Sequence, residues 1–284
     1  MTHDEAKLAG GVAVITGAGS GIGAGIARRA GILGMTVVVA DIDQAGAARV
    51  AAEIVAAGGT AEAIVADVSK HAELDRLADL VFEKYGKVRL LVNNAGIETL
   101  GFCWEIPAER WEATLNINLH GVIHGVRAFV PRMLASGEEC WIANLASIGA
   151  FGIMPTQAAY LVTKHAVQAF SENLFLELQL AQAPIHVSSV IPGYVKTAIF
   201  AENDRKDEPA DAARHRQTMS AMMQTHGMDA DEAGRVILEG VAAGHFWVST
   251  QPETTQQMVA GRIAYLQDQT DPPLRPETRA LLGY

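Results

Sequence analysis

Cysteine is scarce in this chain of 284 residues. The two cysteines, Cys103 and Cys140, stand apart from each other, and neither belongs to a CxxC pair. Disulfide frameworks and thiolate zinc sites both require several cysteines at short spacings. We therefore expect neither a disulfide scaffold nor a thiolate zinc site. His120 and His124 have the spacing of two metal ligands on a helix but no third ligand, so we expect no bound metal ion.

An excess of positive charge and long apolar runs are also missing. The formal net charge is -10 at pH 7, whereas nucleic acid and anionic membranes attract basic surfaces. No run approaches the roughly 20 apolar residues of a membrane-spanning helix, and the polar first residues do not resemble a signal peptide. The composition predicts a cytoplasmic protein with neither nucleic acid nor membrane as a partner.

Repeats, low-complexity tracts and long linkers are absent too, and 49% of the residues are hydrophobic. This suits one large domain over residues 1–284 with a sizeable core. Short runs rich in β-branched residues alternate with longer helical patterns, without the polar alternation of half-exposed strands. The runs cover residues 12–15, 36–40, 63–66, 90–92, 141–144, 186–191 and 246–249. This alternation predicts an α/β fold with a doubly wound parallel sheet of about seven strands and helices on both faces.

Two segments depart from the alternation. Residues 198–230 are polar and rich in Met and Ala, and we expect them to form a helical substrate lobe. Residues 251–284 form a C-terminal extension that contains three prolines near its end. In open α/β sheets ligands bind beyond the carboxyl ends of the strands, where the strand order reverses, so the site is expected there.

A glycine-rich turn follows the first predicted strand. Residues 16–23 read Thr-Gly-Ala-Gly-Ser-Gly-Ile-Gly, and a helical pattern begins directly afterwards. Glycine permits a tight turn and a close approach to a pyrophosphate, and the next helix N-terminus attracts phosphate. The position between strand and helix predicts dinucleotide binding, with a plain tight turn as the alternative. The expected binding residues are Gly17, Ser20, Gly21, Ile22 and Gly23.

The second and third predicted strands end in aspartates. Asp41 can accept both hydroxyls of an adenosine ribose and would repel a 2′-phosphate. No basic residue lies beside it in the sequence, so we expect NAD rather than NADP, with Ile42 in the same site. Asp67 and Val68 could bind the adenine amino group, although a turn or N-cap role for Asp67 is an equal alternative.

Further motifs follow the later strands in a consistent order. They are Asn93-Asn94-Ala95-Gly96, Asn118 within residues 116–121, Ser147, Tyr160 with Lys164, and Pro192-Gly193 with Thr197. With the glycine turn, they make the chain resemble the classical short-chain dehydrogenase/reductase family over about residues 8–200. The resemblance implies a Rossmann fold and a homodimer or homotetramer that associates through helices around 111–133 and 159–180. It also implies cofactor binding by Asn94, Ala95, Gly96, Tyr160, Lys164, Pro192, Gly193, Val195 and Thr197.

The candidate catalytic residues are Ser147, Tyr160, Lys164 and Asn118. Tyr160 and Lys164 are four residues apart, so on a helix they share one face. A phenol has an ordinary pKa of about 10, and we expect the Lys164 ammonium and an oxidised nicotinamide to favour phenolate. Tyr160 could then take a proton from an alcohol or return it to a carbonyl oxygen, which Ser147 would hold. The resemblance implies that Lys164 also binds the nicotinamide ribose and that Asn118 holds a water joining Lys164 to solvent.

The candidate pocket residues are mostly apolar, and Glu98 is the exception. The apolar ones are Ile97, Leu100, Phe102, Trp104, Ile153, Met154, Phe200 and Met223. They predict an apolar, aromatic or steroid-like secondary alcohol, or its ketone, as the small-molecule substrate of a hydride transfer. The alternatives are an NADPH-dependent carbonyl reductase, an epimerase or dehydratase of the same fold, and a non-catalytic dinucleotide-binding regulator. The intact set of candidate catalytic residues argues against the regulator.

Overall fold

The computed structural model describes residues 1–201 and 208–283. A sheet of seven parallel strands forms its centre, in the order β3-β2-β1-β4-β5-β6-β7. The strands are β1 (Val12–Thr16), β2 (Thr36–Asp41), β3 (Thr60–Val65), β4 (Leu90–Asn93), β5 (Cys140–Leu145), β6 (Ile185–Ile191) and β7 (Trp247–Ser249). The predicted doubly wound parallel sheet is confirmed. The strand order reverses between β1 and β4, which places the switch point at the middle of the sheet.

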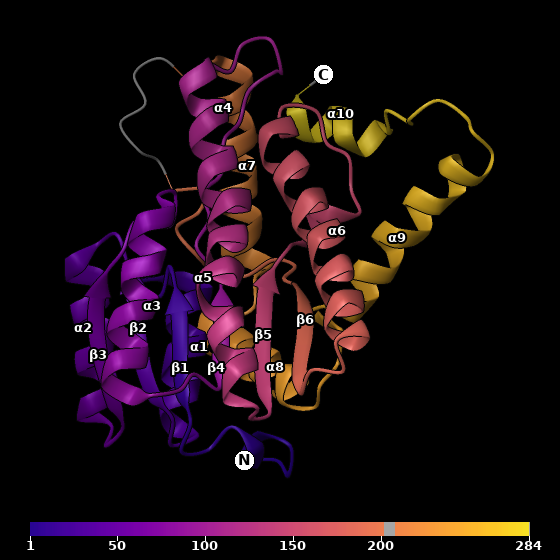
Figure 1. Ribbon diagram of the computed structural model, residues 1–284. Helices are drawn as coiled ribbons and strands as arrows, with labels where there is room; N and C mark the ends of the chain where they lie inside the picture. The colour runs from indigo at the N-terminus through magenta and orange to yellow at the C-terminus, as the bar shows by residue number, and fades with distance from the viewer. Residues whose placement is uncertain (202–207, 284) are drawn as a thin grey trace.

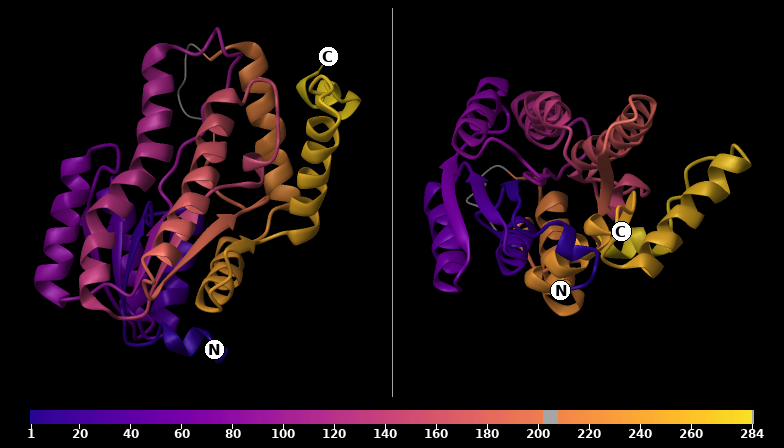
Figure 2. Two further views of the ribbon diagram at one scale, coloured as in Figure 1. Left: turned by 45° about the vertical axis from the view of Figure 1, so that its right-hand side comes forward. Right: turned by 60° about the horizontal axis from the view of Figure 1, so that its bottom comes forward.

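Helices cover both faces of this sheet (Figures 1 and 2). One face packs against α1 (Gly21–Ile32), α2 (Gln44–Ala56) and α8 (Ala230–Ala242). The other packs against α3 (His71–Tyr85), α5 (Gly121–Ser136) and α6 (Ala158–Leu180). Every residue of β1, β4 and β5 is therefore buried, which explains why these strands show no polar alternation.

The edge strand β3 begins earlier than its apolar run indicates. It starts at Thr60 rather than Ala63, and its residues are exposed or half-buried. An edge strand has one free side, so polar residues such as Glu62 are tolerated within it. The Glu62 carboxylate accepts hydrogen bonds from Lys84 Nζ at 2.6 Å and from the Tyr85 hydroxyl at 2.7 Å, both from the end of α3.

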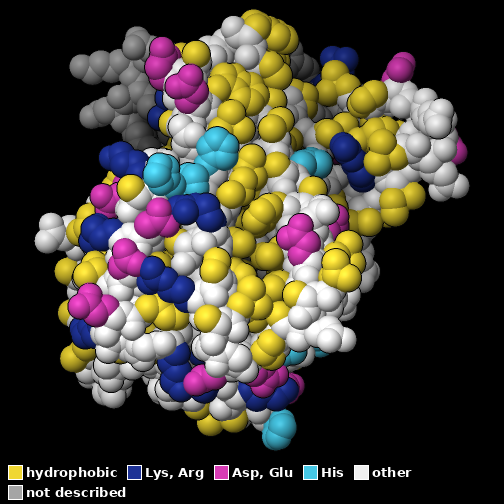
Figure 3. Space-filling model, viewed as in Figure 1, with side chains coloured by type: hydrophobic (Ala, Val, Ile, Leu, Met, Phe, Trp, Pro, Cys, Tyr) yellow, Lys and Arg dark blue, Asp and Glu magenta, His cyan; other side chains and the backbone are white. Residues whose placement is uncertain are grey.

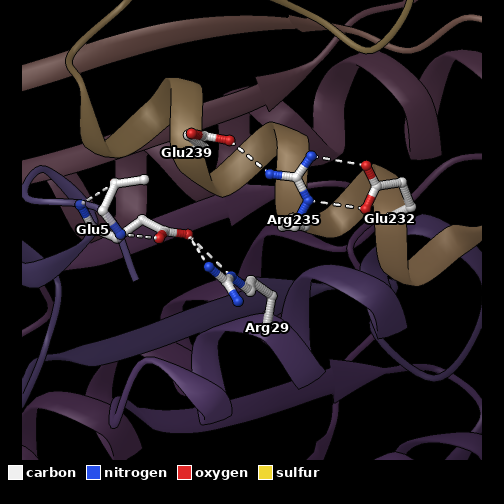
Figure 4. A network of polar contacts seen from close by, with 6 residues as sticks. Glu5, Arg29, Glu232, Arg235 and Glu239 are labelled. Carbon is white, nitrogen blue, oxygen red and sulfur yellow. Dashed lines mark hydrogen bonds and ion pairs between the residues drawn. The ribbon is translucent and has the colours of Figure 1, made fainter.

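An ion pair joins the N-terminal segment to α1, next to a group of ion pairs within α8. In the short helix η1 (Glu5–Lys7), the Glu5 carboxylate is 1% exposed and lies 2.5 Å from Arg29 Nη2 of α1. Arg235 of α8 binds Glu232 and Glu239 on either side of it, at 2.8 Å each. Figure 4 shows these two groups close together where η1, α1 and α8 meet.

The remaining elements lie around the carboxyl edge of the sheet or beyond its last strand. They are α4 (Ala108–Leu115), the π-helical turn η2 (Asn116–His120), η3 (Ile148–Ala150), α7 (Ala210–His226), α9 (Pro252–Gln267) and α10 (Pro276–Leu282). The predicted substrate lobe contains α7, and its residues 202–207 lie outside the described residues. In the predicted C-terminal extension, α9 stands outside α6 and buries no residue, and α10 returns towards α7 (Figure 1). Arg214 Nη1 of α7 donates to the Leu282 carbonyl at 2.8 Å.

Two absences hold for residues 1–201 and 208–283. No helix there is long and apolar enough to cross a membrane. No group of three or more His, Cys, Asp and Glu side chains there is arranged to hold a metal ion.

Candidate active site

A cavity of about 500 Å³ opens at the carboxyl edge of the sheet, above the switch point between β1 and β4. The loops that follow β1 to β6 all contribute to its wall. Asp41 lies at one end, and α7, α9 and α10 close the other. The cavity therefore joins the predicted dinucleotide site to the predicted substrate site.

The glycine turn lies against the end of β4. Gly17 has a φ of +63°, and a Cβ there would come within 2.7 Å of the Ala95 Cα. Asn94 Nδ2 donates to the carbonyls of Thr16 at 2.8 Å and Gly17 at 3.0 Å, which braces the turn. Gly23 does not line the cavity: a Cβ there would lie 2.4 Å from Asn94 Nδ2, so glycine is needed for packing behind the wall. The other four predicted residues of the turn line the cavity.

Asp41 is held at the cavity wall by backbone donors. Its Oδ2 accepts from Gly19 N at 2.8 Å and its Oδ1 from Asp43 N at 2.9 Å. A carboxylate oxygen has more than one acceptor site, so both oxygens keep capacity for ribose hydroxyls. No cation was expected near this turn, but Arg49 of α2 donates to the Gly19 carbonyl at 2.8 Å. Its other terminal nitrogen binds Glu53 at 2.7 Å.

Asp67 both lines the cavity and stabilises a turn. Its Oδ1 accepts from Ser69 N at 3.0 Å and from the Ser69 hydroxyl at 2.6 Å. The N-cap of α3 is Lys70, so the N-cap alternative for Asp67 is wrong and the turn alternative is observed. Ile42 and Val68 also lie in the wall, next to Asp41 and Asp67.

The loop after β6 is clamped by residues that follow β7. Gly193 N donates to Thr250 Oγ1 at 3.0 Å, and Tyr194 N donates to Gln251 Oε1 at 2.9 Å. These bonds fix the backbone that carries Pro192, Gly193, Val195 and Thr197 into the cavity wall. The sequence analysis missed Gln251, because its role depends on a strand-end contact 57 residues away.

Ser147, Tyr160 and Lys164 meet in the middle of the cavity wall. Lys164 Nζ donates to the Leu145 carbonyl at 2.8 Å and lies 5.5 Å from the centre of the Tyr160 ring. The Ser147 hydroxyl lies close enough to Tyr160 to lower the pKa of that phenol, and it accepts from Gly149 N at 3.0 Å. The spacing of four residues on α6 thus brings the phenol and the amine to one face.

Burial changes the acidity of both α6 residues. Desolvation lowers the pKa of Lys164 to about 8, although Glu98 opposes this change. Desolvation raises the pKa of Tyr160 above its ordinary value, Glu98 adds to the increase, and the hydrogen bond with Ser147 opposes it. Without a cofactor, desolvation therefore favours the phenol form of Tyr160, and the prediction that Lys164 and an oxidised nicotinamide together favour phenolate stays a prediction. The desolvated site keeps Tyr160 as a phenol, which is the form that donates a proton.

Asn118 lies behind the cavity wall and is fully buried. Its Oδ1 accepts from Ile97 N at 2.8 Å, and its Nδ2 donates to the Ile97 carbonyl at 2.9 Å and to Thr163 Oγ1 at 3.2 Å. Both amide hydrogens are committed to protein atoms. The side chain therefore joins the loop after β4 to α6.

The substrate end of the cavity is mainly apolar. The predicted residues found in its wall are Ile97, Ile153, Met154, Phe200 and Met223. Leu100 packs behind Phe200 and Met223 rather than in the wall. The predictions for Phe102 and Trp104 are wrong, because their rings stack on each other 5.1 Å apart and Trp104 is 80% exposed. The sequence analysis missed Met258 of α9 and Leu281 of α10, which both line the cavity.

Comparisons with known proteins agree with this geometry. The family model for short chain dehydrogenases matches residues 11–208. The chain belongs to the short-chain dehydrogenase/reductase family. It is 30% identical over 252 residues to a CLA biosynthesis dehydrogenase/reductase of Lactiplantibacillus plantarum, which covers 85% of this chain and 88% of that protein.

Solved members of the family have the same fold. A short chain dehydrogenase/reductase from Burkholderia phymatum in complex with NAD has a TM-score of 0.90 and 33% identity, covering 95% of this chain and 99% of that one. A metagenomic short-chain oxidoreductase in complex with NADP has a TM-score of 0.69 and 29% identity, covering 86% and 97%. The fold of this family binds nicotinamide dinucleotides, and its members are oxidoreductases.

Proposed function

We propose that this chain is an NAD-dependent oxidoreductase that interconverts a secondary alcohol and a ketone by hydride transfer. The observation that carries the proposal is the meeting of Ser147, Tyr160 and Lys164 in the wall of a cavity that extends to Asp41. The apolar wall beyond Tyr160 supports an apolar, aromatic or steroid-like substrate.

The cavity fits a nicotinamide dinucleotide at its cofactor end. A Cβ on Gly17 or Gly21 would narrow the channel towards Ala95 or Thr197, so the glycines keep this path open. Ser20 directly precedes the first residue of α1, where free N–H groups suit a pyrophosphate. When bound, the nicotinamide ring accepts or supplies the hydride.

The protein residues provide the proton transfer. In the reduction direction, the Tyr160 hydroxyl donates its proton to the carbonyl oxygen, and Ser147 orients the same oxygen. The Lys164 ammonium, fixed by the Leu145 carbonyl, stabilises the phenolate that remains. In the oxidation direction the Tyr160 phenolate, stabilised by the Lys164 ammonium, would take the proton from the alcohol and become the phenol. We assign Asn118 a positioning role, because its side chain holds the loop at Ile97.

Asp41 supports NAD over NADP. Its carboxylate faces the cavity where the adenosine ribose of a dinucleotide bound along the strand ends would lie. A 2′-phosphate there would be repelled by this charge. Arg49, which reaches the same turn, is already engaged by Glu53 and by the Gly19 carbonyl.

The test is absorbance at the reduced-nicotinamide band, with purified protein, NAD or NADP, and secondary alcohols of aliphatic, benzylic and steroidal types. We expect an increase with NAD and a bulky apolar alcohol. A signal with NADP alone would contradict the role given to Asp41. NAD binding without any redox signal, but with product formed, would instead favour the epimerase or dehydratase alternative.

We further propose that the chain forms a homodimer or homotetramer through α5 and α6. Exposed apolar side chains on these helices include Leu134, Val162, Leu176 and Leu180. Figure 3 shows hydrophobic side chains gathered over this face. An apolar face of this extent favours association. Light scattering after size exclusion measures the mass, and a monomer at micromolar concentration would contradict the proposal.

A further inference from the structure

Glu98 is a buried carboxyl group in the wall of the cavity, at the start of its mainly apolar substrate end. It follows Ile97 in the loop after β4, is 2% exposed and lines the cavity together with Gln157. The wall beyond the catalytic residues is built mainly from Met, Ile, Phe and Leu side chains. Burying a carboxyl group among such residues is costly, and the hydride transfer proposed above does not use it.

The hydrogen bonds of Glu98 leave part of its capacity open. Its Oε1 accepts from Thr99 N at 3.2 Å, and its Oε2 accepts from Gln157 Nε2 at 3.0 Å. An ionised carboxyl group has about four acceptor sites, and a neutral one has an O–H donor besides its remaining acceptor sites, so Glu98 can make a further bond in either form. A contact that served only to join these two loops could be made by two apolar side chains without the cost of desolvating a carboxyl group.

The charge state of Glu98 limits what it can bind. Desolvation raises its pKa to about 8, although Gln157, Thr99, Arg216 and Lys164 all oppose this. At neutral pH the group is therefore mainly an uncharged acid, which can both donate and accept a hydrogen bond. Arg216 is itself paired with Glu208, at 3.0 Å from its Nε to Oε1. The site thus suits a neutral oxygen better than a charged group.

We infer that Glu98 and Gln157 bind a second neutral oxygen of the substrate, a hydroxyl or carbonyl on a carbon other than the reacting one. This inference rests on the proposed function and narrows it. The substrate class becomes a hydroxy ketone, or the corresponding diol, on an apolar skeleton. Gln157 lies three residues before Tyr160, so the second oxygen is bound next to the reacting group.

The test compares ketones that differ by one hydroxyl. Acetophenone is paired with 2-hydroxyacetophenone, and propiophenone with 3-hydroxypropiophenone. Each ketone is titrated by calorimetry into the protein saturated with NAD, because the oxidised cofactor cannot reduce the carbonyl group, and absence of the reduced-nicotinamide band shows that the added hydroxyl is not oxidised. We expect the hydroxy ketone of at least one pair to bind about tenfold more tightly, as one hydrogen bond to a buried polar group supplies.

Three substitutions test whether the preference for the hydroxy ketone depends on Glu98. Glu98→Leu should reduce the affinity ratio within the pair to about 1, whereas Glu98→Gln, which still donates and accepts, should keep most of it. Glu105→Leu changes an exposed residue of the same loop and should leave the ratio unchanged. NAD affinity and circular dichroism check that each variant is folded. If Glu98→Leu does not fold, Gln157→Leu provides the same comparison and should lower the ratio.

The outcomes separate this inference from the proposed function. Turnover with NAD but equal binding within both pairs would overturn the role of Glu98 and leave the proposed function standing. An affinity ratio within the pair that persists in Glu98→Leu would also overturn the role of Glu98. A preference that Glu98→Leu abolishes supports the inference, even if no ketone is reduced with NADH, in which case the proposed function fails.

Discussion

The two ends of the cavity are built in different ways. At the cofactor end, the wall comes from loops that directly follow β1, β2, β3 and β4, and short bonds to the backbone hold them, such as Asn94 to Gly17 and Asp41 to Gly19. At the substrate end, the wall combines loops with α7, α9 and α10, which lie outside the sheet. Among these, α9 buries no residue at all.

This difference indicates where the molecule tolerates change. The loops at the cofactor end directly follow strands of the sheet, which fix their backbone. The neighbouring residues therefore cannot shift to accommodate a substitution there. The substrate end depends on side chains from peripheral elements, whose replacement reshapes the wall without disturbing the sheet. We therefore expect effects on the reaction to decrease from the catalytic residues to the cofactor end and then to the substrate end.

The largest expected effect is that of Tyr160→Phe. Removing the hydroxyl removes the proton donor, so kcat for ketone reduction should fall about 10³-fold. NAD affinity, measured by calorimetry, should change less than about twofold, because the cofactor end is untouched. Tyr85→Phe is the matched control, since that hydroxyl binds Glu62 away from the cavity. Substantial turnover by Tyr160→Phe would show that another group transfers the proton.

A second substitution tests the cofactor end. Asp41→Asn removes the charge that would repel a 2′-phosphate while keeping the shape of the side chain. The preference for NAD over NADP, taken as the ratio of their Kd values, should fall about 100-fold, through weaker NAD and stronger NADP binding. Asp43→Asn is the control, because Asn also serves as the N-cap of α2. An unchanged ratio in Asp41→Asn would show that other residues determine the preference for NAD, and Arg49 would be the first of them to test.

The same comparison shows how far the sequence predicts the molecule. The strands, the glycine turn and the spacing of Tyr160 and Lys164 could be predicted because each depends on a local pattern. Arg49, Gln251 and Leu281 could not, because the role of each depends on a contact between separate elements: Arg49 binds the Gly19 carbonyl, Gln251 binds the loop after β6, and Leu281 of α10 lines the cavity. The cofactor end is thus predicted better than the substrate end.

The errors around residue 102 have a local cause. Gly101 adopts a φ of +146°, and its N–H donates to the Thr156 carbonyl at 2.8 Å. The chain turns away from the cavity at this point, so Phe102 and Trp104 stack on each other at the surface. The sequence shows a glycine followed by aromatic residues, but not the direction in which the chain leaves the turn.

The third prediction concerns the stability of the substrate end. The folded-state pKa of Glu98 is raised to about 8 from an ordinary value of 4.5. Between these values the folded protein binds more protons than the unfolded chain, so the contribution of Glu98 to stability falls as pH rises from 5 to 8. Gln does not titrate. The Tm of Glu98→Gln relative to the unsubstituted protein should therefore rise by at least about 2 °C across this interval.

Thermal unfolding at several pH values measures this difference. Glu105→Gln changes an exposed carboxylate of the same loop, and its Tm difference should stay constant between pH 5 and 8. A constant difference for Glu98→Gln as well would show that Glu98 is already ionised in the folded protein. The neutral acid would then be unavailable to donate a hydrogen bond to the substrate.

The smallest expected effect belongs to the C-terminal extension. Leu281 of α10 lines the cavity, and Leu281→Ala removes part of its apolar wall. KM for bulky aromatic ketones should rise about threefold to fivefold, as the loss of one to two buried methylenes over a partly open surface predicts, while KM for small ketones stays the same. Leu274→Ala, at an exposed leucine outside the cavity, should change neither. If Leu281→Ala leaves both KM values unchanged, α10 does not contact the substrate, and the wall of the substrate end stops at α7 and α9.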